Sequence, residues 1–313
     1  MAVTTDPFTG TDLAAFISET WTPIVNEELF AKTVFANFVT DLTPYASESD
    51  IFHVPNAFTN SFTVQTQSTQ GAEITTESPA QTDTTLTIDT HKYVATLIGD
   101  KDAAQLAKIY DYNGVYARKS GRSVADALED SLAALWSGLS TNSVGDTATS
   151  LTDLELRQSI EKLASGNFPL DECAWFFHTY VYWTQIAALV RLYYGGFQAT
   201  TYATPATMGN FGPMDASRGL QGSIYGIPVF TSTNVVSGLL TYRNLLLHKS
   251  CFGFATQQLP NNGGSATPRV QVRADYLLQN LGLLTISSIL YGTAELRDAG
   301  GVVVNASTTG TVS

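Results

Sequence analysis

The chain has 313 residues, a hydrophobic content of 44% and a formal net charge of -12 at pH 7. This composition excludes a disordered chain and indicates a folded protein with a substantial core, divided over two lobes. A chain this acidic is a poor candidate for gripping a phosphate backbone, which requires clustered Lys and Arg. Only 14% of the residues are charged, against roughly 25% in an average soluble domain. We therefore expect much of the surface to be covered in the working state.

The negative charge is concentrated at the start of the chain. Residues 1–90 contain 12 acidic residues and a single lysine, Lys32, whereas the charges of the remaining residues nearly balance. Two interpretations stay open. This third of the chain is either an acidic, solubilising segment, or it leaves its own subunit and lies against basic patches on other copies.

Residues 1–50 are predicted to form an extended arm. Apolar residues at helical spacing indicate two short helical pieces between residues 11 and 38, and Pro23 breaks any continuous helix between them. Phe30 and Phe35 belong to a run that is too apolar to lie in water. We expect this run to dock on the body of the protein or on a partner.

Residues 51–98 are predicted to form a long β-hairpin. Apolar residues alternate loosely in both arms, as in half-buried strands, and the second arm continues through Tyr93, Ala95 and Leu97. Between the arms, residues 65–85 hold 13 Ser, Thr or Gln among 21 residues. A loop this long favours a protruding hairpin with a polar, mobile tip over a plain linker. The apolar residues of its arms that we expect to contact another subunit are Phe58, Phe62, Val64, Leu86 and Ile88.

A long helix follows, and its second half has a clear apolar stripe. The stripe recurs every three or four residues, and acidic residues lie outside it. Gly114 and Gly121 weaken the first half by about 1 kcal/mol each, which predicts a bend or a late start. The stripe consists of Val124, Leu128, Leu132, Leu135 and Leu139. The acidic residues assigned to the opposite, polar side are Asp126, Glu129 and Asp130.

Three basic residues crowd the N-terminal end of this helix: Arg118, Lys119 and Arg122. They are interpreted as a contact for the acidic arm of another copy, or as an ordinary solvated helix end.

The rest of the chain alternates helices and strands. Thr152 and Glu155 form a capping box for a helix over residues 153–165, with Leu154, Ile160 and Leu163 facing inward. An aromatic strand is predicted over residues 174–182 and a further helix over 184–194. A Gly- and Pro-rich surface excursion then spans 195–222. The last predicted strands lie within residues 222–232, 245–258 and 270–304.

The order of these segments, together with several short motifs, resembles a tailed-bacteriophage major capsid protein of the Hong Kong 97-type fold. Extended arm, polar-tipped hairpin and spine helix come first, and a lobe with a capped helix and a W-F-F-H strand follows. The resemblance covers nearly the whole chain. The later motifs are G-I-P-V at 226–229 with F-T-S after it, L-L-H-K at 246–249, R-A-D-Y at 273–276 and Y-G-T-A-E-L-R-D-A-G-G-V at 291–302.

This resemblance implies an α+β fold with a mixed α/β axial domain. Residues 1–50 would be the N-terminal arm, and residues 51–98 the extended β-hairpin loop that reaches over an adjacent subunit. Residues 99–150 and 259–313 would form the peripheral domain with the spine helix. Residues 151–258 would form the axial domain, which faces the centre of each hexamer or pentamer.

The resemblance also implies a function and partners. The chain would assemble with itself, through hexamers and pentamers, into an icosahedral head that encloses double-stranded DNA without sequence-specific binding. Assembly would occur in the cytoplasm of a bacterial host, and the mature location would be the virion. The chain starts directly at the arm, so scaffolding would come from another protein or be absent, and a portal and decoration proteins are further expected partners. The covalent Lys–Asn crosslink of some relatives cannot start from the hairpin tip, because no Lys lies between Lys32 and Lys92.

The sequence gives no sign of catalysis, and we expect no cofactor and no metal. The four histidines stand alone, and nucleotide-binding or nucleophile motifs are absent. Cys173 and Cys251 are expected to be buried and reduced. We also see no signal peptide and no membrane span. Two other functions stay open: an encapsulin-type shell around a protein cargo, and a β-rich tail or binding protein that forms no shell.

Overall fold

The computed structural model describes residues 24, 25, 27, 33–46, 50–55, 64, 66, 71, 73, 74, 76, 83–101, 112–186, 220–235, 238, 241–259, 265, 266 and 270–307. Several predictions fall outside these residues. They concern the contacts of Phe30, Phe58 and Phe62, most of the two helical pieces of the arm, and the excursion up to residue 219.

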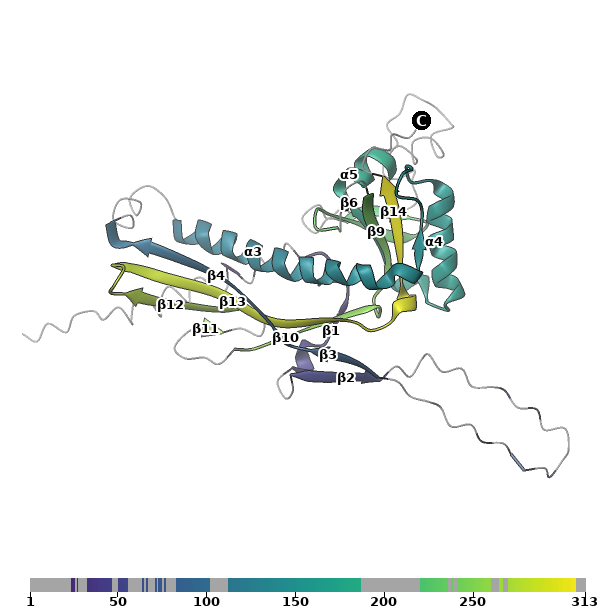
Figure 1. Ribbon diagram of the computed structural model, residues 1–313, viewed down its shortest axis with the longest axis horizontal. Coiled ribbons are helices and arrows are strands. Elements are labelled where there is room, and N and C mark those ends of the chain that lie inside the picture. Colours follow the sequence, from purple (N-terminus) through teal and green to yellow (C-terminus); the bar gives the residue numbers. More distant parts are fainter. Residues whose placement is uncertain are drawn as a thin grey trace, which may run out of the picture.

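The longer of the two six-stranded sheets is built on β13 (Gly282–Glu295). One edge of β13 pairs with β4 (Thr90–Gly99). The other edge pairs with β12 (Gln271–Leu277) and then with β10 (Phe252–Gln257), and all three pairings are antiparallel. Figure 1 shows this sheet lying along the longest dimension of the molecule. Two short strands complete it, β1 (Thr40–Asp41) and β11 (Ser265–Ala266).

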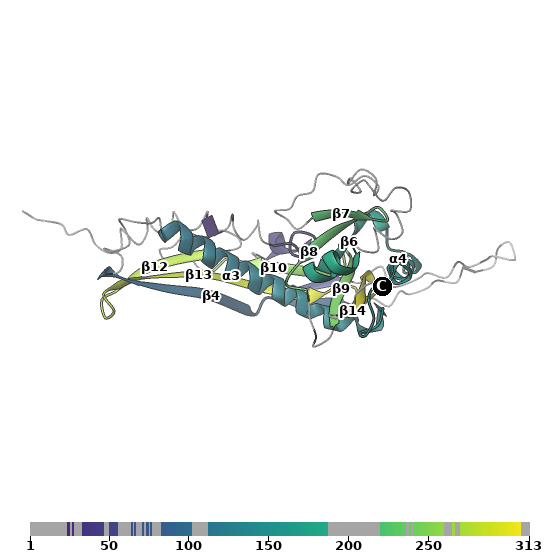
Figure 2. The ribbon, with the colours of Figure 1, turned by 90° about the horizontal axis from the view of Figure 1, so that it is seen from above.

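The predicted long helix covers one face of this sheet. α3 (Tyr112–Ala134) runs along the sheet and continues as a 3-10 helix over Leu135–Thr141 (Figures 1 and 2). The predicted inward stripe is confirmed, because four of its members are fully buried and Leu135 is partly buried. α3 begins at Tyr112 and includes both Gly114 and Gly121, so neither glycine ends the helix, and the expected bend stays a prediction. Packing against the sheet outweighs the weak helix propensity of glycine.

One acidic residue of α3 lies on the other side of the helix from the one predicted. Glu129 was assigned to the polar face with Asp126 and Asp130, but its side chain is only 1% exposed. Asp130 is exposed and Asp126 is half-buried, as expected for a polar face. The assignment of Glu129 failed because its carboxylate has backbone partners in the arm, which allow a charged group to be buried.

The second sheet is compact and mixed. Its central strand β6 runs antiparallel to β9 on one side and parallel to β8 on the other. α4 (Asp153–Ser165) packs against β14 (Figure 1), and this lobe has its own apolar core. The strands lie in the order β5 (Ser143–Val144), β14 (Gly301–Ser307), β9 (Thr241–His248), β6 (Cys173–His178), β8 (Ile227–Ser232) and β7 (Leu220–Ile224).

The capping box of α4 is confirmed, but its predicted inward face is partly wrong. The Thr152 amide donates to a Glu155 carboxylate oxygen at 2.6 Å, and Leu163 is buried. Leu154 is 55% exposed, and Leu156 is buried in its place. Because residues at i and i+7 share a helix face, docking through Leu156 and Leu163 turns Leu154 toward solvent.

The aromatic strand is shorter than predicted. β6 ends at His178, and helical turns follow in α5 (Thr179–Val181) and in a π-helix over Tyr182–Ile186. The strand ends there because His178 Nδ1 accepts a hydrogen bond from the Tyr180 amide at 3.1 Å and so caps the following turn. The helix predicted over 184–194 is described only up to Ile186.

The hairpin is also shorter than predicted. β2 (Ile51–Pro55) pairs antiparallel with β3 (Asp83–Thr87), and these two strands form a separate two-stranded sheet. Tyr93 and Leu97 lie in a strand as expected, but this strand is β4 of the long sheet. β4 leaves the hairpin because β13 offers it a ten-residue ladder, whereas β2 is five residues long.

After α3 has led the chain from β4 of the long sheet into the compact sheet, the chain crosses between the two sheets twice more, between β9 and β10 and between β13 and β14. β10, expected in the axial domain, belongs to the long sheet, and β14, expected in the peripheral domain, belongs to the compact sheet. These last two crossings meet at Cys251, whose carbonyl accepts hydrogen bonds from the Leu296 and Arg297 amides at 2.7 and 3.1 Å. The two sheets therefore share a backbone junction as well as side-chain packing.

Candidate functional site

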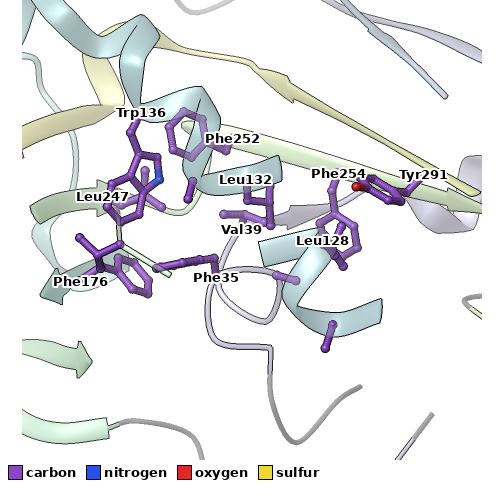
Figure 3. Close-up of a cluster of buried hydrophobic side chains, with 14 of the residues drawn as sticks. Phe35, Val39, Leu128, Leu132, Trp136, Phe176, Leu247, Phe252, Phe254 and Tyr291 are labelled. Atoms are coloured by element: carbon purple, nitrogen blue, oxygen red, sulfur yellow. The ribbon is translucent and has the colours of Figure 1, made fainter. Parts of the chain in front are cut away.

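The arm enters the core where the two sheets meet. The Phe35 ring lies 5.1 Å from the rings of both Trp136 and Phe176, with edge-to-face geometry (Figure 3). Phe38 also contacts Phe176, and Val39 is buried in the same cluster. This cluster joins side chains from the arm, α3 and both sheets. Of the two positions predicted for Phe35, the body or a partner, the structure shows docking on the body.

Glu129 fixes the same segment through its backbone. Its two carboxylate oxygens lie 3.0 Å from the Phe35 amide nitrogen, and Oε1 also accepts from the Ala36 amide at 3.1 Å. Burial raises the pKa of Glu129 from 4.5 to about 7, and Asp126 adds to this effect, whereas the amides of Phe35, Ala36 and Val34 oppose it. The carboxyl is therefore a titratable group inside the junction between arm and helix.

The base of the hairpin is attached to the face of the long sheet opposite α3. Leu86 and Ile88 are buried there in a small cluster with Ala46 and Ala255, and Phe52 packs against it. These two predicted contact residues therefore pack within their own chain. Val64, beyond β2, is 92% exposed and free to contact a neighbour.

The three predicted basic residues lie on the exposed surface of α3. Arg118, Lys119 and Arg122 are all exposed, and Arg122 Nε lies 4.0 Å from the Asp126 carboxylate one turn away. A pair this exposed is worth roughly 0.5 kcal/mol or less, since water screens it. The cluster therefore presents positive charge outward, as both sequence interpretations require.

Part of the long sheet carries apolar side chains on the face away from α3. The Tyr291 hydroxyl bonds Ser131 Oγ of α3 at 2.6 Å, so alternate residues such as Leu284 and Ile286 point away from the helix. Leu97 is the cross-strand partner of Leu284 and is 45% exposed, and Tyr93 on the same strand is 67% exposed. We call Tyr93, Leu97, Leu284 and Ile286 the open face.

β4 is also an edge strand. Among the described residues its ladder is with β13, and Figure 2 shows β4 along the margin of the sheet. β4 is ten residues long, and alternate residues along it direct their N–H and C=O groups to this margin. An exposed edge of this length is a template for pairing with another chain.

The titratable side chains of the described residues are candidates for metal ligands and nucleophiles. They include no group of three or more His, Cys, Asp or Glu side chains that could hold a metal ion. Cys173 and Cys251 are buried free thiols, as predicted. Burial raises the pKa of Cys173 to about 12 and that of Cys251 well above its usual value, so neither thiol is activated. Within the same part of the chain, no helix is long and apolar enough to cross a membrane.

Comparisons by sequence find no matching protein family and no matching curated protein. Solved structures do match. A structure of Mycobacterium phage Che8 is 19% identical and aligns over 87% of this chain and 91% of its own, with a TM-score of 0.59. A capsid structure of cyanophage P-SCSP1u is 14% identical, covers 87% of each chain and has a TM-score of 0.61. The SrpI encapsulin of Synechococcus elongatus is 14% identical, covers 88% of each chain and has a TM-score of 0.54.

The chain has the Hong Kong 97-type capsid fold. This confirms the α+β class and the overall order of elements predicted from the sequence.

Sequence reasoning missed two features of this capsid fold. The first is Glu129, and a signal existed: Ala125 and Ala133, one turn before and after it, are small residues on the same helix side. Both are buried, as close approach of another segment requires. The second is the open face, whose residues come from β4 and from β13, strands far apart in sequence. No local pattern in either segment indicates that these side chains meet.

Proposed function

We propose that the chain is the major capsid protein of a tailed bacteriophage. Copies assemble through hexamers and pentamers into an icosahedral head that encloses double-stranded DNA. The observation that carries this proposal is the long sheet, which, among the described residues, has α3 on one face, an apolar patch on the other face and an edge strand with no second partner. Such a surface is incomplete in an isolated subunit and is completed by neighbours of the same kind.

The physical argument concerns the burial of apolar surface. A thin subunit has little interior of its own, so extended elements gain stability by packing on adjacent copies. Obligate interfaces of this kind bury on the order of 2,000 Å² or more. Closed symmetry repeats each contact around the shell, so modest contacts add up to a stable particle.

Specific contacts between copies follow from the same proposal. Arg118, Lys119 and Arg122 meet the acidic arm or hairpin of another copy, because the first 90 residues carry nearly all of the net negative charge. Val64 packs on a neighbour from the extended loop. Phe30, Phe58 and Phe62 stay predicted contacts. Phe35, Leu86 and Ile88 support this surface from inside their own chain.

The acidic balance of the chain also suits a DNA container. A net charge of -12 disfavours adhesion of packaged DNA to the inner wall, so DNA is enclosed without sequence-specific binding. A scaffolding protein, a portal and decoration proteins are further proposed partners, and assembly in the bacterial cytoplasm precedes the virion. The protein acts structurally, and no enzymatic role is proposed.

A second candidate is an encapsulin-type shell that encloses a protein cargo. The similarity to the SrpI encapsulin favours it, because phage heads and encapsulins are alternative uses of one fold. A tail or binding protein without a shell is disfavoured, because the similarity to capsid and encapsulin chains extends over almost their entire length.

Electron microscopy of the expressed full-length chain tests the proposal. We expect closed particles of megadalton mass, which light scattering also detects. A compact monomer or a small closed oligomer under all assembly conditions would contradict a shell function. Particles from infected cells that contain DNA support the phage head, whereas particles filled with a protein support the encapsulin alternative.

A further inference from the structure

The buried carboxyl of Glu129 is the acceptor for the start of a turn in the arm. The Phe38 and Val39 amides donate to the Phe35 carbonyl at 2.9 and 3.0 Å, so the later amides of the turn are used within it. The amides at its start, those of Phe35 and Ala36, donate to Glu129 instead. A side chain 94 residues away in sequence from Phe35 thus replaces the local cap that such a turn otherwise needs.

The surroundings of Glu129 leave its charge poorly compensated. On α3 its charged neighbour is Asp126, which has the same sign and raises its pKa. The arm supplies no charged side chain between residues 33 and 40. From β13 the nearby titratable group is Tyr291, whose hydroxyl is occupied by Ser131 and the Ala127 carbonyl. Backbone amides are therefore the stabilising partners of an ionised Glu129 among the described residues.

We propose that Glu129 is a pH-dependent attachment point between residues 33–39 of the arm and α3. It holds the arm when its carboxyl is neutral and loosens when the carboxyl ionises. This role concerns the single subunit and goes beyond shell formation.

The direction follows from linkage. In the docked arm the pKa of Glu129 is about 7, and after release its carboxyl is in water with the ordinary value of 4.5. The docked form therefore retains a proton that the released form gives up between these two values. Docking is strongest below pH 4.5, and this contribution is lost as the pH rises through 7. From pH 5 to pH 8 the docking equilibrium weakens roughly ten- to a hundredfold.

Hydrogen exchange of the full-length protein tests whether the attachment of the arm to α3 depends on pH. Exchange of the Phe35 and Ala36 amides is measured from pH 5 to pH 9 and divided by the intrinsic rate at each pH. We expect the opening of these amides to increase by at least tenfold over this range, with a midpoint near pH 7. The Val304 amide in β14 of the compact sheet is the internal reference, and it stays constant if the arm opens locally.

Two variants decide the cause. Glu129→Gln keeps the size of the side chain and removes its titration, so the corrected opening becomes independent of pH. Asp126→Asn removes the neighbouring negative charge and moves the midpoint to lower pH, and this test works even if the glutamine variant fails to fold. Asp130→Asn, on the exposed face of the same helix, is the matched control and retains the wild-type profile. A pH-independent wild-type arm, or a midpoint unmoved by Asp126→Asn, overturns the proposal.

Discussion

At the scale of single residues, two side chains set the position of the arm. Phe35 supplies apolar contact at the junction of the sheets, and the Glu129 carboxylate accepts hydrogen bonds from the Phe35 and Ala36 amides. The two act on the same residues by different physics, since aromatic packing does not depend on pH, whereas a buried carboxyl does. Docking of the arm thus has a contribution from Phe35 that is independent of pH and a proposed contribution from Glu129 that depends on pH.

Truncating the Phe35 ring tests the packing contribution. We expect Phe35→Ala to lower the free energy of unfolding by about 3–5 kcal/mol, because it leaves a cavity between Trp136 and Phe176. Tyr45→Ala, in the same segment but exposed, is the control and changes this free energy by about 0.5 kcal/mol or less. Urea denaturation of dispersed subunits measures both, and equal effects of the two variants would contradict the role of Phe35.

At the scale of elements, one face of α3 packs in the core and another face is exposed to solvent. Its apolar stripe packs on the long sheet, and its first half presents Arg118, Lys119 and Arg122 outward. Because exposed cations cost little stability, this surface can change without loss of the fold. An effect of these residues on assembly is therefore separable from an effect on folding.

Reversing this cluster tests its role. Replacing Arg118, Lys119 and Arg122 together by Glu is expected to impair particle formation while the melting temperature of the subunit changes by only a few degrees. The control exchanges the same residues for the other basic type, Arg118→Lys, Lys119→Arg and Arg122→Lys, and assembles normally. Light scattering over a range of salt concentrations provides the measurement, since screening weakens contacts between exposed charges. Normal particles from the triple Glu variant would exclude the proposed contact.

Sequence periodicity predicted the features that depend only on the residues of a single helix or strand. The inward stripe of α3 and the capping box of α4 follow from local spacing, and both are present. What the sequence could not supply depends on distant partners. The sequence of β4 predicts a hairpin arm, but the strand pairs with β13. The sequence around Glu129 predicts a surface residue, but its carboxylate is bonded to the arm. Tertiary hydrogen bonding decided both cases.

At the scale of the whole molecule, the two faces of the long sheet differ in how much of their apolar surface is covered by other elements. Within the part of the chain that the structure describes, α3 covers one face of the long sheet, and the hairpin covers part of the other, around Leu290 and Ala294. The remaining part is the open face, bordered by the edge of β4. An apolar surface next to the outer edge of a strand favours a permanent contact with another chain over exposure to water.

A charge placed on the open face tests this conclusion. We expect Leu97→Asp to block particle formation, because the carboxylate is desolvated at the contact between subunits. The folded subunit is expected to stay stable, since Leu97 already has nearly half of its side chain in water. Leu97→Val keeps the surface apolar and serves as the control. Electron microscopy scores assembly and circular dichroism scores folding, and intact shells from the Asp variant would rule out a contact there.

The last crossing between the sheets, from β13 to β14, has a consequence for synthesis. β13 is the central strand of the long sheet, and β14 lies inside the compact one, between β5 and β9. Both strands are encoded at the very end of the described chain. Neither sheet can be completed before β13 and β14 have been synthesised, so a polypeptide on the ribosome that still lacks these strands does not yet offer neighbouring nascent chains a finished surface to join.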